Sequence, residues 1–183
     1  MNVKTLETKR LTLRKFRTDD LDAFYSFLSR PENSIYSYYW PNNVDDTRRF
    51  ICEAIQKAEG APCEDFQYAA VLKTGNILIG SCNFVLSSDS NMGWIVDGEY
   101  WNQGYATEMA RAMLTLGFME LGLPRIIACC DAENVASYRI MEIIGMRREG
   151  FYPECRRAHK CSDRKHSDEV VYAISRDEWA AQK

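Results

Sequence analysis

Residues 99–109 read EYWNQGYATEM and join a short apolar run to the longest helical pattern of the chain. Residues 92–96 before them favour a strand, and the apolar residues of 104–121 cover more than half of a helical circumference. The free N–H groups and the dipole at the start of such a helix favour an anion over the turn. Gly104 lets the backbone approach a ligand closely. The stretch therefore predicts strand, turn and helix, with room for a pyrophosphate.

Two phosphate-binding motifs are absent from the turn, and their absence excludes some classes of ligand. It has no GxxxxGK[ST] pattern, which would bring a lysine and a magnesium-binding hydroxyl to a nucleotide, and no GxGxxG pattern for a dinucleotide. One glycine at the start of a helix is also typical of a tight connection that binds nothing. Both interpretations of the turn, anion site and plain connection, stay open on these residues alone.

The residues before the turn predict a strand, two helices and a three-stranded meander. Residues 10–16 (RLTLRKF) alternate in polarity like a strand with one buried face. Thr18 is expected to cap a helix that ends near Arg30, because Pro31 disfavours helical geometry in the residue before it. The aromatic segment 35–41 is expected to be a loop. The other expected elements are a helix at 46–59 ended by Gly60 and strands at 66–72, 77–86 and 92–96, with a hairpin turn at 73–76.

The residues after the turn predict a strand–helix–strand–helix unit and a final pair of strands. The expected elements are a helix at 104–121, a strand at 125–130, a helix at 134–144, and strands at 146–152 and 169–174. The crossover from 92–96 to 125–130 should be parallel and right-handed. The order β-α-α-β-β-β-α-β-α-β-β, without repeats or linkers, predicts a single domain over residues 1–183, of the α+β (mixed α/β) class.

Composition excludes several classes of function. The 23 basic and 26 acidic side chains give a net charge of -3, which does not favour binding to nucleic acid. The 7 cysteines form no CxxC pair, and no histidines stand at zinc spacing, so neither a metal site nor a disulfide framework is expected. No signal core and no run near ~18 apolar residues is present. We expect a cytoplasmic protein with reduced thiols and no membrane partner.

The stretch 101–106 (WNQGYA) resembles the Q/R-x-x-G-x-G/A signature of the GNAT superfamily of N-acetyltransferases. Trp101 at its first position resembles the WxxGYATE form common in the ribosomal-protein N-acetyltransferase-like (RimJ/RimL-type) branch. The resemblance also covers KRLTLRKFRTDDLDAF at 9–24, ENVASYRIMEIIGMRREG at 133–150 and VVYAISRDEW at 170–179. These blocks occur in the family's order over almost the whole chain.

The resemblance implies a mixed, mostly antiparallel sheet flanked by helices, in which the parallel strands 92–96 and 125–130 splay apart. Pantetheine of acetyl-coenzyme A would enter the gap and hydrogen-bond the main chain of Ile95 and Val96. Asn134 would reach the cofactor beyond the pyrophosphate, although the same residue could only cap its helix, and the two roles can coexist. The pyrophosphate would bind the amides of Asn102, Gln103, Gly104, Tyr105, Ala106 and Thr107.

The acid that protonates the leaving thiol is a departure from the family pattern. Many family members carry a tyrosine on the helix after the second core strand, and Met141 occupies that position here. In the branch that this chain resembles, a serine three residues after the asparagine has the acid role, and Ser137 has this spacing. Tyr138 is its neighbour, but adjacent helical side chains point about 100° apart, so the two cannot serve the same sulfur.

The base is a second departure, because Cys129 stands where some relatives carry a glutamate. Glu154 lies in the region after RREG where the branch can place a catalytic glutamate, with a spacing two residues different. Rival candidates are Glu99, His159 and His166. A covalent acetyl-cysteine mechanism at Cys129 or Cys130 is rejected, because no histidine is near and buried strand cysteines usually pack.

The resemblance implies an N-acetyltransferase that moves an acetyl group from acetyl-CoA directly to a primary amine. The alternative is a non-catalytic acyl-CoA sensor, motivated by the departures at Met141 and Cys129. The acceptor would be chosen by the aromatic segment 34–43 and the basic segment 153–167. A small-molecule amine and a protein N-terminus are both compatible with these segments, and so are a monomer and a homodimer.

Overall fold

The computed structural model describes residues 3–37, 43–60, 63–87, 89–157 and 165–182. Its strands are β1 (Leu6–Glu7), β2 (Leu11–Lys15), β3 (Asp65–Leu72), β4 (Ile77–Val85), β5 (Asn91–Val96), β6 (Arg125–Asp131), β7 (Arg147–Arg157) and β8 (His166–Ser175). Its helices are α1 (Leu21–Leu28), α2 (Pro31–Ser34), α3 (Val44–Glu59), α4 (Tyr105–Thr115), α5 (Val135–Ile143) and α6 (Arg176–Ala180). Shorter turns are η1 (Thr18–Asp20), η2 (Gly98–Tyr100) and the π-helical η3 (Leu116–Glu120).

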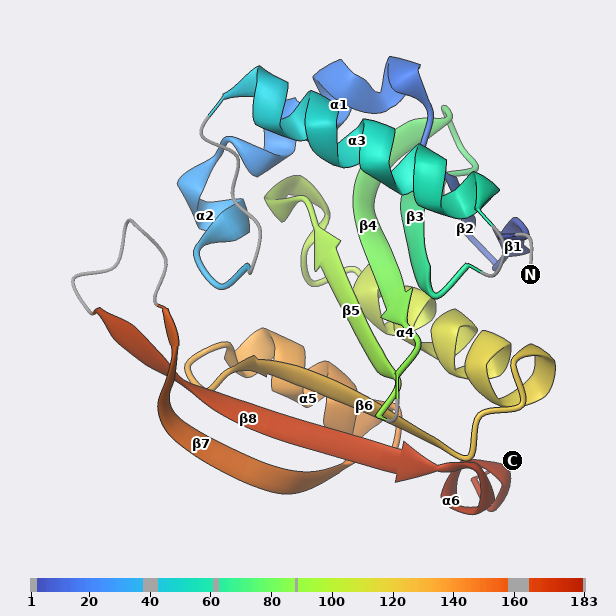
Figure 1. Ribbon diagram of the computed structural model, residues 1–183, viewed down its shortest axis with the longest axis vertical. Coiled ribbons are helices and arrows are strands. Elements are labelled where there is room, and N and C mark those ends of the chain that lie inside the picture. The colour runs from blue at the N-terminus through green and yellow to red at the C-terminus, as the bar shows by residue number, and fades with distance from the viewer. Residues whose placement is uncertain (1–2, 38–42, 61–62, 88, 158–164, 183) are drawn as a thin grey trace.

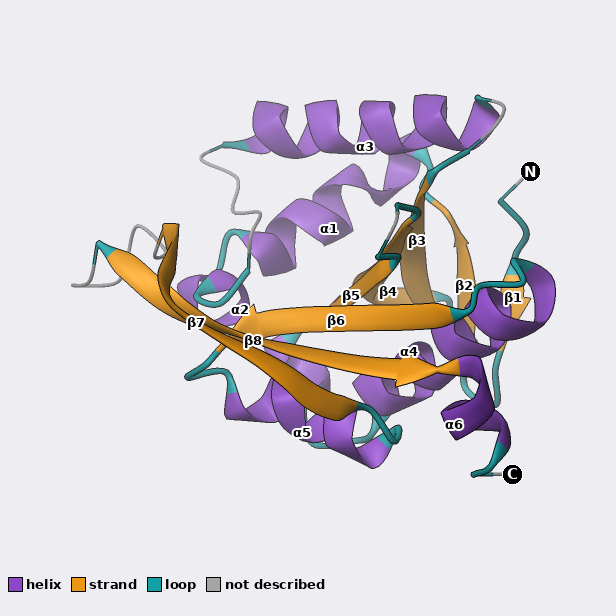
Figure 2. Ribbon diagram, turned by 60° about the horizontal axis from the view of Figure 1, so that its bottom comes forward, coloured by secondary structure: helices purple, strands orange, loops and turns teal. Residues whose placement is uncertain are grey.

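The strands form one sheet in the order β1-β2-β3-β4-β5-β6-β8-β7. Its neighbours are antiparallel except β5 and β6, which run parallel. Helices α1 and α3 cover one face, and α4 and α5 cover the other (Figure 1 and Figure 2). The mixed, mostly antiparallel sheet with one parallel pair confirms the predicted fold class.

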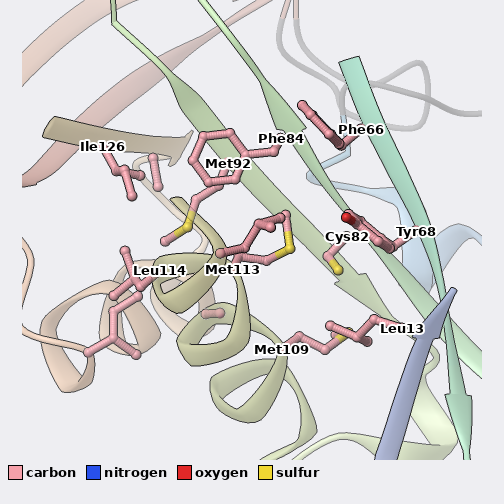
Figure 3. Close-up of a cluster of buried hydrophobic side chains, with 14 of the residues drawn as sticks. Leu13, Phe66, Tyr68, Cys82, Phe84, Met92, Met109, Met113, Leu114 and Ile126 are labelled. Carbon is pink, nitrogen blue, oxygen red and sulfur yellow. The ribbon is translucent and has the colours of Figure 1, made fainter. Parts of the chain in front are cut away.

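Two apolar clusters, one on each face of the sheet, hold the layers together. The first includes Phe84 and Met92 of the sheet with Met109 and Met113 of α4 (Figure 3). The second packs aromatic rings of α1 and α3 against the sheet. Phe24 of α1 has its ring centroid 5.6 Å from that of Phe50 in α3. Burial of this kind contributes about 25 cal/mol per Å² of apolar surface, so α4 is fixed firmly to the sheet that it crosses.

Most predicted elements are present, with differences at their ends. Thr18 does not cap α1, because it begins η1 and the N-cap position of α1 belongs to Asp20. The carboxylate of Asp20 accepts hydrogen bonds from Arg17 and Arg14, which fixes the turn in place of a hydroxyl cap. Pro31 follows the end of α1 as predicted, but it also starts α2, where its fixed φ suits the first turn of a helix.

The long helix predicted over 104–121 is two segments, α4 and the π-helical turn η3. Gly117 lies in η3 against the sheet, where a Cβ would stand only 2.5 Å from Cδ1 of Ile126. The sequence analysis did not predict β1, α2 and α6, because these elements are too short to show a periodic pattern. Strands β7 and β8 extend beyond the predicted 146–152 and 169–174.

The parallel pair β5–β6 touches at one end only. The register contains the single pair Asn91↔Ile127, and the amide of Ile127 donates to the carbonyl of Ser90 over 2.9 Å. Beyond this pair the two strands diverge toward the C-terminal end of β5 (Figure 1). The splayed pair that the resemblance implied is therefore present, and its open end adjoins the turn that leads into α4.

Candidate active site

The free edge of β5 faces β6 across the splay, and the ladder with β4 decides which main-chain groups lie on it. The register pairs Ser81 with Ile95 and Gly80 with Val96, and the amide of Asp97 donates to the carbonyl of Ile79 over 2.8 Å. Because antiparallel ladders alternate, the main chain of Ile95 also points to β4, whereas that of Val96 points to the gap. Ile95 and Val96 thus adjoin the same gap, but only Val96 presents polar main-chain groups to it.

The turn after β5 closes back on the strand through Trp101. The indole N–H of Trp101 donates to the carbonyl oxygen of Val96 over 2.7 Å, and the side chain is 46% exposed. Asn102 follows with φ of 59°, a left-handed conformation that asparagine tolerates better than most residues. Gln103 is exposed, and its side-chain amide donates to the carbonyl of Glu99 over 3.2 Å. These hydrogen bonds hold the predicted phosphate turn in its conformation, because they join its residues to Val96 and Glu99.

Gly104 is the N-cap of α4, with φ of 80° and no capping side chain. The N–H groups of Tyr105, Ala106 and Thr107 belong to the first turn of the helix, so no residue four positions earlier accepts from them. All three residues are partly exposed. A cavity of about 790 Å³ runs along the outer side of α4 from Gly104 toward Thr115, beside the N-terminal segment and not between β5 and β6.

Helix α5 begins at the end of β6. The side chain of Asn134 accepts from the amide of Ser137 over 3.1 Å, so the predicted capping role of Asn134 is present. Ser137 is partly exposed, and its side chain lies near the thiol of Cys130 in β6. Burial raises the pKa of the Cys130 thiol to about 11, although the neighbouring Ser137 side chain opposes the rise. The thiol is therefore neutral at physiological pH, which agrees with rejecting it as a nucleophile.

Met141, at the usual tyrosine position, is 1% exposed and belongs to the core between α4, α5 and the sheet. Tyr138 packs against the edge of the same core, and the guanidinium of Arg139 lies 5.9 Å from its ring centroid. Ser137 lies in the first turn of α5, near Cys130 of β6. Its position follows from the cap, since Asn134 sets where the first turn of α5 starts.

Glu154 lies in β7 at an irregularity of the β7–β8 ladder, with φ of 47° and an exposed side chain. Its amide donates to the carboxylate of Asp168 over 2.9 Å, and the carbonyl of Asp168 accepts from Ala132 just after β6. The main chain of Glu154 is therefore linked through Asp168 to the residue that follows β6. Among the rivals, Glu99 pairs with Arg30 over 3.0 Å, His166 is exposed, and His159 lies outside the described residues.

A buried polar cluster at the end of β5 was not predicted from the sequence. The carboxylate of Asp97 accepts from Arg30 over 2.6 Å and from the amide of Asn33 over 3.1 Å. The side-chain oxygen of Asn33 in turn accepts from the N–H of Gly98 over 2.8 Å. These bonds fix α2 to the residues just before the phosphate turn. No local pattern marks them, because each joins positions more than sixty residues apart.

A second missed group holds the turn from the other side. Arg10, the residue just before β2, contacts Gln103, Tyr105 and Glu108. Arg10 and Glu108 both stand in the stretches that carry the family resemblance, but neither stretch by itself indicates that the two residues meet. The described residues contain no group of histidine, cysteine and acidic side chains placed to hold a metal. None of the described helices is long and apolar enough to cross a membrane.

An open parallel strand pair, followed by a helix whose first amides lack a capping side chain, is the arrangement that the resemblance to acetyltransferases implied. Comparison with known proteins agrees, since the profile of the acetyltransferase (GNAT) domain matches residues 10–147. An uncharacterised N-acetyltransferase of Bacillus subtilis, YnaD, is 37% identical over 95% of this chain and 98% of its own length. The chain belongs to the GNAT family of acetyltransferases, as the sequence resemblance indicated.

Solved structures show the same fold. A GNAT-family acetyltransferase from Bacillus anthracis has a TM-score of 0.81 at 33% identity, covering 95% of this chain and 99% of that one. The ribosomal-protein acetyltransferase RimL, in complex with coenzyme A, also has a TM-score of 0.81, at 15% identity over 94% and 98% of the two chains. At that identity RimL shows the fold alone.

Proposed function

We propose that this acetyltransferase uses acetyl-CoA to acetylate a primary amine by direct transfer within the gap between β5 and β6. The observation that carries the proposal is the junction of that gap with α4. The polar main chain of Val96 borders the gap, and the N–H groups that begin at Gly104 lie at its open end. One extended molecule with an amide-containing arm and a pyrophosphate matches both features.

The residues present suit the cofactor. Backbone N–H groups at a helix start bind phosphate oxygens without a metal, and the dipole of α4 adds to the attraction. Gly104 leaves the phosphate turn open, because the nearest atom to a Cβ at this position is Nη2 of Arg10, 3.5 Å away. The carbonyl oxygen of Val96 accepts from Trp101 and has a second lone pair for an amide N–H of pantetheine. Asn134, fixed as the cap of α5, lies where β6 passes into that helix.

The chemistry requires a polarised thioester carbonyl, a neutral amine and a protonated leaving thiolate. The N–H of Val96 is the donor that we assign to the carbonyl. Ser137 is assigned the proton for the thiolate, since its hydroxyl faces β6 and its helix start is held by Asn134. A base is required, because an aliphatic amine with a pKa of about 10 is mostly protonated at neutral pH. We assign this role to Glu154.

The acceptor is a primary amine, and a protein N-terminus is the first class to test. Two ribosomal-protein acetyltransferases share the fold, with TM-scores of 0.81 and 0.80. A small-molecule amine is the other class that suits the aromatic segment 34–43, because aromatic rings hold cations. Residues 38–42 of that segment, and the centre of the basic segment 153–167, lie outside the described residues. The cysteines that the structure describes are free thiols, which supports a reducing compartment such as the cytoplasm.

Release of coenzyme A thiol with a panel of amines tests the proposal. N-terminal peptides, polyamines and aminoglycosides are each offered with acetyl-CoA, and the product is identified by a mass increase of one acetyl group. We expect turnover with one class. The alternative of an acyl-CoA sensor is favoured by Met141, whose buried side chain leaves α5 without the usual tyrosine. Tight cofactor binding without turnover on any amine would support the sensor and refute the enzyme.

A further inference from the structure

The carboxylate of Glu108, in the first turn of α4, is held by three hydrogen bonds from the start of the chain. The Thr8 hydroxyl donates over 2.6 Å, and the amide and Nε of Arg10 each donate over 2.7 Å. The side chain of Glu108 is 16% exposed. Burial would raise the pKa of Glu108, but these bonds and the charge of Arg10 outweigh it and lower the pKa, so the carboxylate is ionised at neutral pH.

The guanidinium that Glu108 orients reaches three consecutive residues of the phosphate turn. Nη1 of Arg10 donates to the carbonyl oxygen of Gln103 over 2.8 Å. Its Cζ lies 4.2 Å from the ring centroid of Tyr105, a cation–π contact. Nη2 lies beside Gly104. One side chain, from the residue just before β2, therefore touches the turn at each residue from 103 to 105.

The bond to Gln103 has a consequence for the next amide. A trans peptide is planar, and its C=O and N–H point in opposite directions. Because Arg10 holds the carbonyl of Gln103 toward itself, the N–H of Gly104 is turned away from Arg10 and from the N-terminal segment. This N–H is one of the donors assigned to the pyrophosphate. Arg10 thus fixes the direction of a phosphate donor without taking the phosphate's place.

We propose that Arg10, oriented by Glu108, is a positioning residue that aims the Gln103–Gly104 peptide at the pyrophosphate of the cofactor. The inference rests on the proposed function, since it requires that the turn binds coenzyme A. It concerns binding of the phosphates and not the acyl transfer itself. Lysine cannot replace the arginine, because a single ammonium lacks the fork that bonds Glu108 and Gln103 at once.

Calorimetric titration with coenzyme A, on the wild type and on Arg10→Lys and Glu108→Gln, measures the effect on the complete ligand. Ligand-observed NMR titration with pantetheine, which has no phosphate, measures the remainder of the site. We expect each variant to bind coenzyme A roughly 10-fold or more weakly, as for loss of a charge-assisted hydrogen bond, with pantetheine affinity unchanged. In turnover, KM for acetyl-CoA should rise while kcat stays near the wild-type value.

Arg14→Lys is the matched control, because Arg14 lies in β2, four residues after Arg10, and its guanidinium forms two bonds to Asp20, away from the turn. It should lower the melting temperature and leave coenzyme A binding unchanged. If the wild type binds coenzyme A and both variants bind it equally well, the positioning role is refuted while the proposed function stands. Equal losses for coenzyme A and pantetheine would also refute it, as a general structural effect. A wild type that does not bind coenzyme A overturns both.

Discussion

The indole N–H of Trp101 donates to the carbonyl oxygen of Val96 over 2.7 Å, so the first residue of the WNQGYA signature is bonded to the last residue of β5. The bond spans the base of the turn that joins the strand gap to α4. A cofactor that occupies both the gap and the phosphate turn must pass next to this side chain. Trp101 is therefore a natural reporter of cofactor binding.

Coenzyme A should protect Trp101 from a soluble quencher. The side chain is 46% exposed, so acrylamide reaches it in the free protein, and a bound cofactor covers it. The measurement is tryptophan fluorescence quenching with and without coenzyme A. The protection should disappear in Trp101→Phe and persist in Trp179→Phe, whose ring packs on Phe118 away from the turn. Equal protection in both variants would contradict the assigned path.

Ser137→Ala should lower kcat by about 100-fold or more, the usual effect of removing an acid that protonates a leaving group. KM for acetyl-CoA should change little, because the Asn134 cap bonds the backbone of residue 137 and survives the substitution. Val135→Ala, at an exposed position of the same helix turn, is the control. If Ser137→Ala retains full kcat, the acid is another group, and Tyr138→Phe becomes the next variant.

Glu154→Gln should slow transfer at neutral pH and approach the wild-type rate above a pH of about 10. The reason is that the amine acceptor loses its own proton in that range, and a base is then no longer required. The measurement is the pH profile of kcat/KM for both proteins. A profile for Glu154→Gln that is parallel to the wild type at every pH would exclude Glu154 as the base.

Thiol reactivity should follow burial. Cys52 and Cys155 are exposed and should react first with a thiol reagent in the native protein, whereas Cys82 and Cys130 should react only on unfolding. Burial raises the pKa of both buried thiols, to about 11 for Cys130. These groups bind their protons more tightly in the folded state, so the free energy of unfolding should fall as pH rises from about 9 toward 11. Fast labelling of Cys130 at neutral pH would contradict its placement in the core.

The arrangement of the sheet could be predicted because its signals are local. The hairpin between β3 and β4 follows from Gly75 and Asn76, both of which adopt positive φ in the turn. The strand, turn and helix around Gly104 follow from the change in periodicity and the glycine. The same reasoning missed β1 and α6, because two or five residues cannot show a period.

The supporting contacts of the candidate site could not be predicted in the same way. Arg10 and Glu108 are 98 positions apart, and Asn33 and Asp97 are 64 apart. Each bond depends on how the layers of the fold come together, which periodicity does not encode. The choice between Ile95 and Val96 likewise needed the β4–β5 register, since a strand pattern locates side chains and not the direction of each carbonyl.

The central claim is that the turn at Gly104 and the gap between β5 and β6 bind coenzyme A, and calorimetric titration tests it most directly. The account predicts saturable binding of one coenzyme A per chain, lost in Gly104→Glu. Gly122→Glu is the matched control, because Gly122 also has positive φ, 67°, but lies beyond the other end of α4 and should keep binding. A wild type that shows no saturable binding at millimolar coenzyme A, or a Gly104→Glu variant that binds normally, would contradict the account.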